Sequence, residues 1–126
     1  SGKGMMGFTD VYFCPSHVLQ LSALIMQMVD KDLNGLYHVV SDECLSKYDF
    51  GRRIAKKFGF DESRIKPVSW KDAGLVANRS PLLTLDVTKL KKALGVKLVD
   101  QETGLQSFYD LHKTGYASKL RSMVAA

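Results

Sequence analysis

The sequence is poor in the features that mark membrane proteins, metal centres and disulfide-rich proteins. It has no apolar run of about 18 residues, the length that a membrane-spanning helix needs, and only two cysteines among 126 residues. Cys14 and Cys44 are far apart and lack paired-cysteine spacing, so we predict two reduced, buried thiols. The first four residues lack the architecture of a signal peptide. These absences predict a cytoplasmic protein that does not contact a membrane.

The distribution of charge excludes a second class of protein. Lys and Arg number 18 against 13 Asp and Glu, a net charge of +5. The cations form separate groups on predicted helices whose other faces are apolar, which is typical of solvated helix faces. A nucleic-acid-binding protein would show a continuous basic stripe with interleaved exposed aromatics. We therefore predict no nucleic-acid partner, although the positive balance suits a phosphorylated or acidic ligand.

A short apolar run between two turn signals organises the prediction of the fold. Residues 35–41 (GLYHVVS) are rich in β-branched and aromatic residues and contain no Asp, Glu, Lys or Arg, which is typical of a strand covered on both faces. His38 would then be a hydrogen-bonded core histidine. Because helical segments flank the run, it predicts an α/β fold with a parallel sheet. One strand makes no sheet, so we expect self-association through its edge or pairing with residues 5–13.

Helical periodicity and capping residues predict four helices. The first, from His17 to Asp30 with Ser16 as its cap, is apolar almost all round and should be buried on most sides. Two of the other three should begin at caps and end at glycines, and the last should end before Gly115. Their predicted ranges are Ser46 to Phe58, ended by Gly59; Val87 to Leu94, capped by Asp86 and ended by Gly95; and Gln101 to Lys113.

The remaining segments predict a few short elements within one domain. Residues 5–13 should be extended, Ile65–Val68 an edge strand and Ser69–Asp72 a single turn, whereas residues 74–85 should be irregular. We expect one unit over residues 1–115, followed by a tail over residues 116–126 that is either a frayed helix or disordered.

Two matches to catalytic motifs lack the context that their chemistry needs. Gly2-x-Gly4-x-x-Gly7 has dinucleotide-fingerprint spacing, but no strand precedes it and no helix follows it. Tyr109-x-x-x-Lys113 has the spacing of a proton-donating tyrosine and its lysine, but no cofactor site accompanies it, so Tyr109 is better explained as a core-facing aromatic. The histidines lie on unrelated elements without ligand spacing. We therefore predict no catalytic, cofactor-binding or metal-binding residue in this chain.

Six stretches, in order and spacing, resemble the carboxy-terminal third of extended short-chain dehydrogenases. The most similar group is the dTDP-4-dehydrorhamnose reductases and their sugar-nucleotide relatives. The similarity runs from about residue 8 to about residue 112. The stretches are Asp10-x-x-Phe13-x-Pro15-Ser16-x-Val18-x-x-Leu21, Gly35–Ser41, Leu45–Phe50, Arg79-Ser80-Pro81, Leu85-Asp86-x-x-Lys89-Leu90 and Gly104-Leu105-x-x-Phe108.

The resemblance implies a helix-rich carboxy-terminal lobe with few short strands, detached from its Rossmann half. Residues 35–41 would be the last strand of a Rossmann sheet whose earlier strands lie outside this chain. The lobe would cover a nucleotide-sugar substrate, while the NAD or NADP site and the tyrosine–lysine pair would belong to the missing amino-terminal domain. This chain alone should therefore hold no cofactor and catalyse no turnover, although the parent would be a reductase. A non-catalytic regulatory or interaction module on the same scaffold is the alternative.

The resemblance also implies one substrate-binding residue. Arg79 lies in an irregular segment that would face the cleft, and a guanidinium suits a diphosphate. The family usually has Pro directly after this Arg, whereas Ser80 intervenes here. Arg79 bonded to loop carbonyls is therefore an equally weighted alternative.

Overall fold

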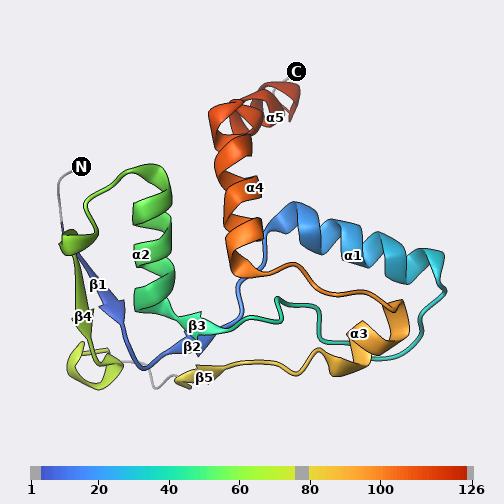
Figure 1. Ribbon diagram of the computed structural model, residues 1–126, viewed down its shortest axis with the longest axis horizontal. Helices are drawn as coiled ribbons and strands as arrows, with labels where there is room; N and C mark the ends of the chain where they lie inside the picture. The colour runs from blue at the N-terminus through green and yellow to red at the C-terminus, as the bar shows by residue number, and fades with distance from the viewer. Residues whose placement is uncertain (1–3, 76–79, 125–126) are drawn as a thin grey trace.

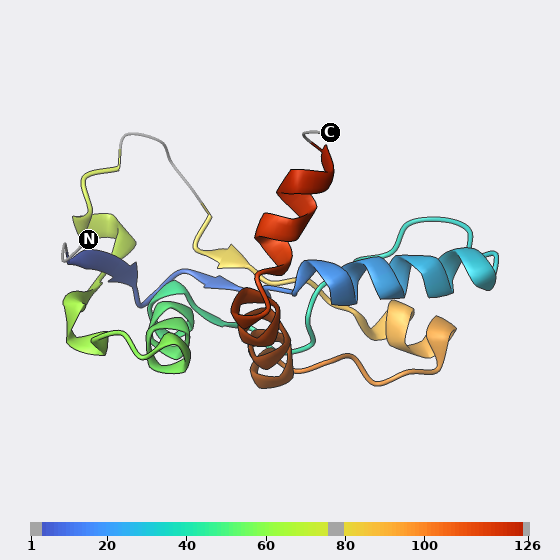
Figure 2. The same cartoon turned by 90° about the horizontal axis from the view of Figure 1, so that it is seen from above.

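The computed structural model describes residues 4–75 and 80–124, and this part of the chain has a mixed α/β fold with short strands. The elements form two groups at opposite ends of the molecule (Figures 1 and 2). One group contains the strands β1 (Met5–Phe8) and β4 (Ile65–Val68) with the helix α2 (Lys47–Phe58). The other contains the helices α1 (Val18–Asp30) and α3 (Thr88–Leu94). The predicted α/β class with few short strands is confirmed.

The segments predicted to be extended, residues 5–13 and Ile65–Val68, contribute to two small sheets. β1 pairs in parallel with β4, in the register Met5↔Ile65 to Phe8↔Val68. In the second sheet β2 (Tyr12–Phe13) lies between β3 (Leu45–Ser46), to which it is antiparallel, and β5 (Leu82–Leu83), to which it is parallel. β5 lies within residues 74–85, which we expected to be irregular. Its two exposed leucines gave no alternating pattern from which a strand could be predicted.

α2 begins and ends where its capping residues predict, and it packs on the first sheet. The Ser46 hydroxyl accepts the Asp49 amide at 3.0 Å and donates to the Asp49 carboxylate at 2.6 Å. Gly59 ends the helix in the left-handed region, with φ 71°. Gly7 of β1 lies so close to α2 that a Cβ there would stand 2.9 Å from Tyr48 Cδ2. The short distance between strand and helix therefore accounts for this glycine.

The core of the other group surrounds α3. Val87, Leu90, Leu94 and Leu98 are buried together, and Leu24 and Met28 of α1 pack against them. The Asp86 carboxylate accepts the Thr88 amide at 2.7 Å, and Gly95 closes the helix with φ 70°. The predicted end at Gly95 is therefore confirmed, whereas the helix begins at Thr88, one residue late, and its N-cap is Val87 rather than the predicted Asp86.

α4 (Gln101–Lys113) joins the two groups and has the bounds that periodicity predicts. It contacts α2 through the Phe58 and Tyr109 rings, whose centroids lie 5.1 Å apart, and through Lys57, which donates to Glu102. After Gly115 the chain continues as α5 (Tyr116–Val124), so the predicted tail is helical (Figure 1).

Short 3-10 turns cover Glu62–Arg64 (η1) and Trp70–Asp72 (η2), the latter capped by Ser69 as predicted. The domain boundary at residue 115 stays a prediction.

The strand predicted over Gly35–Ser41 is wrong. These residues form no strand, do not pair with residues 5–13, and make no backbone–backbone hydrogen bond to another described residue. Side chains fix the segment instead: Lys89 Nζ donates to Leu36 O at 2.8 Å, and His38 Nδ1 contacts Asp86 O at 3.1 Å. His38 is hydrogen-bonded as predicted, but it is exposed rather than in the core. A strand requires a ladder partner, and the described chain supplies none here.

The predicted burial of α1 is also wrong. None of its 13 residues is buried, and Val18, Ile25, Met26 and Val29 are among its exposed apolar side chains. Its cap is His17 rather than Ser16, without a side-chain hydrogen bond. An apolar helix is buried only where other elements cover it, and the described residues cover just part of the surface of α1. Of the helices described, none combines the length and the apolarity needed to cross a bilayer. Localisation in the cytoplasm stays a prediction.

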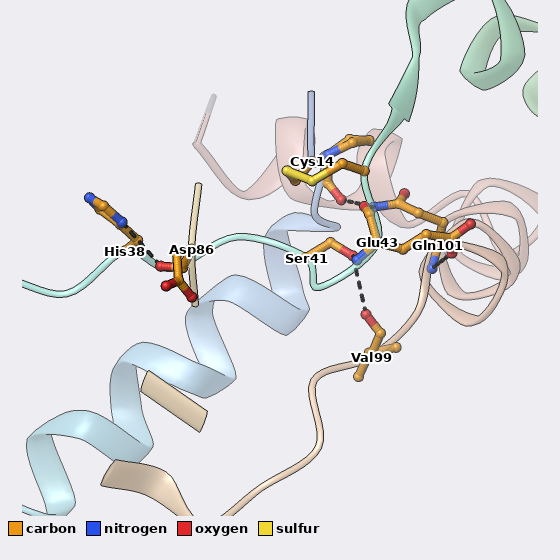
Figure 3. Close-up of a disulfide and its surroundings, with 9 residues drawn as sticks. Cys14, His38, Ser41, Glu43, Asp86, Val99 and Gln101 are labelled. Carbon is orange, nitrogen blue, oxygen red and sulfur yellow. Dashed lines mark hydrogen bonds between the residues drawn. A yellow bond between two sulfur atoms is a disulfide. The ribbon is translucent and has the colours of Figure 1, made fainter. Parts of the chain in front are cut away.

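The cysteines, predicted to be reduced thiols, are joined in a Cys14–Cys44 disulfide (Figure 3). The β2–β3 ladder explains this. Tyr12 pairs with Ser46 and Phe13 with Leu45, so the next residues in register are the two cysteines, with Cα atoms 4.1 Å apart. Sequence separation alone could not reveal the contact, because it depends on the pairing of two strands that are two residues long.

Candidate functional site

The candidate site is a cavity of about 320 Å³ bounded by the second sheet, the end of β1 and the η2 turn. Each strand of the second sheet, or a residue next to it, contributes to the wall. The lining residues are Phe8, Val11, Lys47, Trp70, Leu75, Ser80 and Leu83. A lysine, a serine and a tryptophan thus line this cavity together with apolar residues. Such a combination is typical of pockets that bind small organic ligands.

The ladder between β2 and β3 positions Lys47 in this wall. Its backbone amide donates to Val11 O at 3.0 Å, which extends the antiparallel pairing by one hydrogen bond. Ser46, 2% exposed, caps α2 immediately before it. Lys47 is therefore fixed at the point where strand β3 becomes helix α2, and its side chain is only partly buried. A cation held there suits an anionic group of a ligand.

Asp10 holds Trp70 in the opposite wall. Its carboxylate accepts the Ser69 hydroxyl at 2.6 Å and the Trp70 amide at 2.9 Å. The Ser69 hydrogen bond, and after it that of Trp70, lower the pKa of Asp10 below its ordinary value. The ionised carboxylate therefore connects the turn after β1 to η2, about 60 residues further along the chain.

Acidification should release this connection. Because the pKa of Asp10 is lower in the folded chain than in the unfolded one, its contribution is fully present above about pH 4 and is lost as the pH falls through the lowered value. We expect the emission of Trp70, the one tryptophan in the sequence, to shift to longer wavelength in that range. Asp10→Ala should show the shifted emission at neutral pH. Identical emission from Asp10→Ala and the unaltered chain at pH 7 would contradict this role for Asp10.

Arg79, the predicted substrate-binding residue, lies outside the described residues. The two described residues that flank its segment, Leu75 and Ser80, both line the cavity. Pro81 O accepts the Tyr12 amide at 2.8 Å, which anchors the following residues to β2. The sequence did not predict that Lys47 and Trp70 line one cavity, because their proximity depends on contacts between distant segments. For the wall formed by Trp70, the only hint in the sequence was that the single tryptophan follows the capping residue Ser69.

Two further cavities lie beside other elements of the described chain. One of about 570 Å³ beside α2 is lined by both Asp61 and Arg64, whose side chains form an ion pair at 3.4 Å, so its lining carries no net positive charge. One of about 260 Å³ lies between α1 and residues 96–99. No cluster of three or more His, Cys, Asp or Glu that would hold a metal occurs among the described residues. Tyr109 packs edge-on against Phe58, as expected for a structural aromatic.

Comparison with known proteins identifies the family. The model of the RmlD substrate binding domain matches residues 3–113, almost the whole chain. The chain belongs to the RmlD substrate-binding-domain family. The predicted resemblance to the substrate-binding part of dTDP-4-dehydrorhamnose reductases is therefore confirmed.

Individual relatives agree with this assignment. A probable low-salt glycan biosynthesis reductase of Haloferax volcanii is 28% identical over 88 residues, which cover 70% of this chain and 29% of the relative. The dTDP-4-dehydrorhamnose reductase of Aggregatibacter actinomycetemcomitans is 23% identical over 104 residues, covering 74% and 35%. These names support the reductase hypothesis and give no support to the regulatory alternative.

A solved structure supports the fold. The crystal structure of dTDP-4-dehydrorhamnose reductase from Bacillus anthracis str. Ames, in complex with NADP, superposes with a TM-score of 0.75 at 22% identity. The superposition covers 85% of this chain and 38% of that protein. This RmlD-type domain thus spans about a third of the length of each of these relatives.

Proposed function

We propose that this chain is the nucleotide-sugar-binding portion of an NAD(P)-dependent reductase resembling dTDP-4-dehydrorhamnose reductase, within the extended short-chain dehydrogenases. The observation that carries the proposal is the family match over residues 3–113. NAD or NADP would bind in the parent protein, and the NADP complex of the structural relative supports this. This chain alone would oxidise no NADPH in the presence of a keto-sugar nucleotide.

In this proposal the cavity beside Trp70 binds the nucleotide sugar. Arg79 would pair with the diphosphate as a planar donor, and Lys47 would supply a second cation. The Trp70 ring would contribute flat apolar surface to the base or the sugar. The net charge of +5 favours the approach of such an anion.

An amino-terminal Rossmann domain would cover α1 and residues 35–41. This surface combines the exposed apolar side chains of α1 with Leu36, which is 80% exposed. It also presents backbone groups without a ladder partner among the described residues. A parallel strand of the Rossmann domain would hydrogen-bond to those backbone groups, and the helices of that domain would bury the apolar side chains. Without that domain the same surface would favour self-association, which a strictly monomeric sedimentation profile would contradict.

Calorimetric titration with dTDP-glucose tests the binding site. The unaltered chain should show saturable one-site binding, which Arg79→Ala should weaken by about tenfold or more and Lys47→Ala by about three- to tenfold. Lys71→Ala is the matched control, because Lys71 lies on the η2 turn beside Trp70 but does not line the cavity. Its affinity should stay within about twofold of the unaltered chain.

The same series distinguishes the two roles of Arg79. A diphosphate contact predicts weaker binding at an unchanged unfolding midpoint. If Arg79 only bonds loop carbonyls, Arg79→Ala should lower the unfolding midpoint together with any loss of affinity. Absence of saturable binding by the unaltered, folded chain would overturn the proposed function.

A further inference from the structure

The Cys14–Cys44 disulfide extends one of the two-residue ladders that bear on the candidate site. β2 and β3 share two residue pairs and one further hydrogen bond, from the Lys47 amide to Val11 O. Such a short antiparallel pair is marginal by itself. The disulfide adds a covalent pair in register at one end of the ladder, while Val11 and Lys47, which line the cavity, lie at the other end.

The loop that the disulfide closes is held to the rest of the chain by side-chain contacts and not by a strand ladder. Between the cysteines lie α1, with no buried residue, and residues 35–41, with no backbone–backbone hydrogen bond to another described residue. Near the disulfide, the buried Gln101 side chain donates to Pro15 O and, at 3.2 Å, to Glu43 O (Figure 3). The S–S bond is therefore the covalent link between the ends of β2 and β3, beside the hydrogen bonds of Gln101 and the ion pair of Glu43 with Arg53 at 2.8 Å. A cross-link matters most where the enclosed loop is long and loosely held.

The two sulfur-bearing residues differ in their access to solvent. Cys44 is exposed, whereas Cys14 is 6% exposed. A dissolved thiol therefore reaches this disulfide from the Cys44 side. Exchange with thiols depends on such access as well as on thiolate character.

We propose that Cys14 and Cys44 form a reversible thiol–disulfide site that sets how firmly the β2–β3 ladder holds the walls of the cavity. A thiolate of a dithiol reductant attacks Cys44 Sγ, the S–S bond breaks, and Cys14 leaves as a thiolate that takes up a proton. The second thiol of the reductant then displaces Cys44, so two electrons and two protons pass to the protein. Glutathione disulfide, a low-molecular-weight disulfide, reverses the reaction. Only the expected effect of the redox state on nucleotide-sugar affinity rests on the proposed function.

Amide hydrogen exchange of the native chain tests the site without a ligand. Samples are equilibrated in oxidised or reduced glutathione, and the thiols are counted by alkylation. Reduction should speed exchange of the Lys47 amide by about tenfold or more. The Phe60 amide, which donates to Ala55 O at 2.8 Å at the far end of α2, should stay within about twofold. The affinity for dTDP-glucose should fall severalfold.

Cys44→Ser separates loss of the cross-link from other effects of the reductant. In either glutathione state the Lys47 amide of this variant should exchange at the rate of the reduced unaltered chain. Equal Lys47 exchange in the oxidised and reduced unaltered chain, or cysteines that do not change state across the glutathione series, would overturn the inference. If Lys47 exchange responds but neither state binds dTDP-glucose, the redox site stands and the proposed function fails.

Discussion

Replacing Gly7 with alanine should destabilise the chain by about 1–3 kcal/mol. An added Cβ would stand 2.9 Å from Tyr48 Cδ2, 3.0 Å from Tyr48 Cα and 3.0 Å from Ile65 Cγ2. One of these atoms is backbone, so β1 and α2 would have to separate. Gly7 is also the third glycine of the apparent dinucleotide fingerprint. A loss of this size would support a packing role for this glycine. Chemical unfolding in urea measures the change in the free energy of unfolding.

Gly51→Ala is the matched control, because Gly51 packs against the same isoleucine. Its added Cβ would meet Ile65 Cδ1 at 3.4 Å, an ordinary contact, and the residue lies inside α2. Alanine is favoured over glycine in a helix interior by up to about 1 kcal/mol, so this variant should be neutral or more stable. If Gly7→Ala unfolds at the same urea concentration as the unaltered chain, the described contact between β1 and α2 is wrong.

Leu90→Ala should lower the free energy of unfolding by about 2–5 kcal/mol. Leu90 is 0% exposed and lies at the centre of the buried cluster formed with Val87, Leu94 and Leu98. Truncation removes apolar contacts and leaves a void among side chains that connect α3 to α1. The effect is large compared with the total stability of a small domain, so part of the sample could unfold at 37 °C.

Leu120→Ala provides the comparison for Leu90. Leu120 is 45% exposed on α5, and alanine suits a helix, so the change should stay within about 0.5 kcal/mol. Both values come from urea unfolding followed by circular dichroism. Equal destabilisation by the two variants would show that the core does not surround α3.

Local sequence signals predicted the elements whose ends depend on adjacent residues. Ser46 and Gly59 bound α2, and Gly95 ends α3, because a cap or a left-handed glycine acts within a few residues. The segment from residue 5 to residue 13 was predicted as extended for a similar reason, since Pro15 follows it. These predictions required no knowledge of the distant chain.

The failed predictions concern features that depend on distant partners. Residues 35–41 have the composition of a buried strand, and α1 that of a buried helix, but the described chain offers neither a ladder partner nor a full covering layer. The disulfide and the Asp10–Trp70 hydrogen bond join residues far apart in the sequence. The proposed Rossmann domain would explain the first two mismatches, because composition reflects the environment of the complete fold.

The candidate site was predictable only in part. Resemblance selected Arg79, and the described residues on either side of its segment line a cavity. The convergence of Lys47 and Trp70 on that cavity required the structure, since it follows from β2–β3 pairing and from the Asp10 contact. The rejection of the Tyr109–Lys113 motif stays a prediction, which rests on the absence of a cofactor site beside it in the sequence.

The central claim is that the cavity beside Trp70 binds a nucleotide sugar, and NMR titration of the ¹⁵N-labelled chain with dTDP-glucose tests it most directly. We predict that the single indole N–H signal and the amides of Lys47, Ser80 and Leu83 shift together along one saturating curve, while Gly95 beyond α3 does not move. Shifts centred on α1 and residues 35–41, or no saturable shift in the folded chain, would contradict the claim.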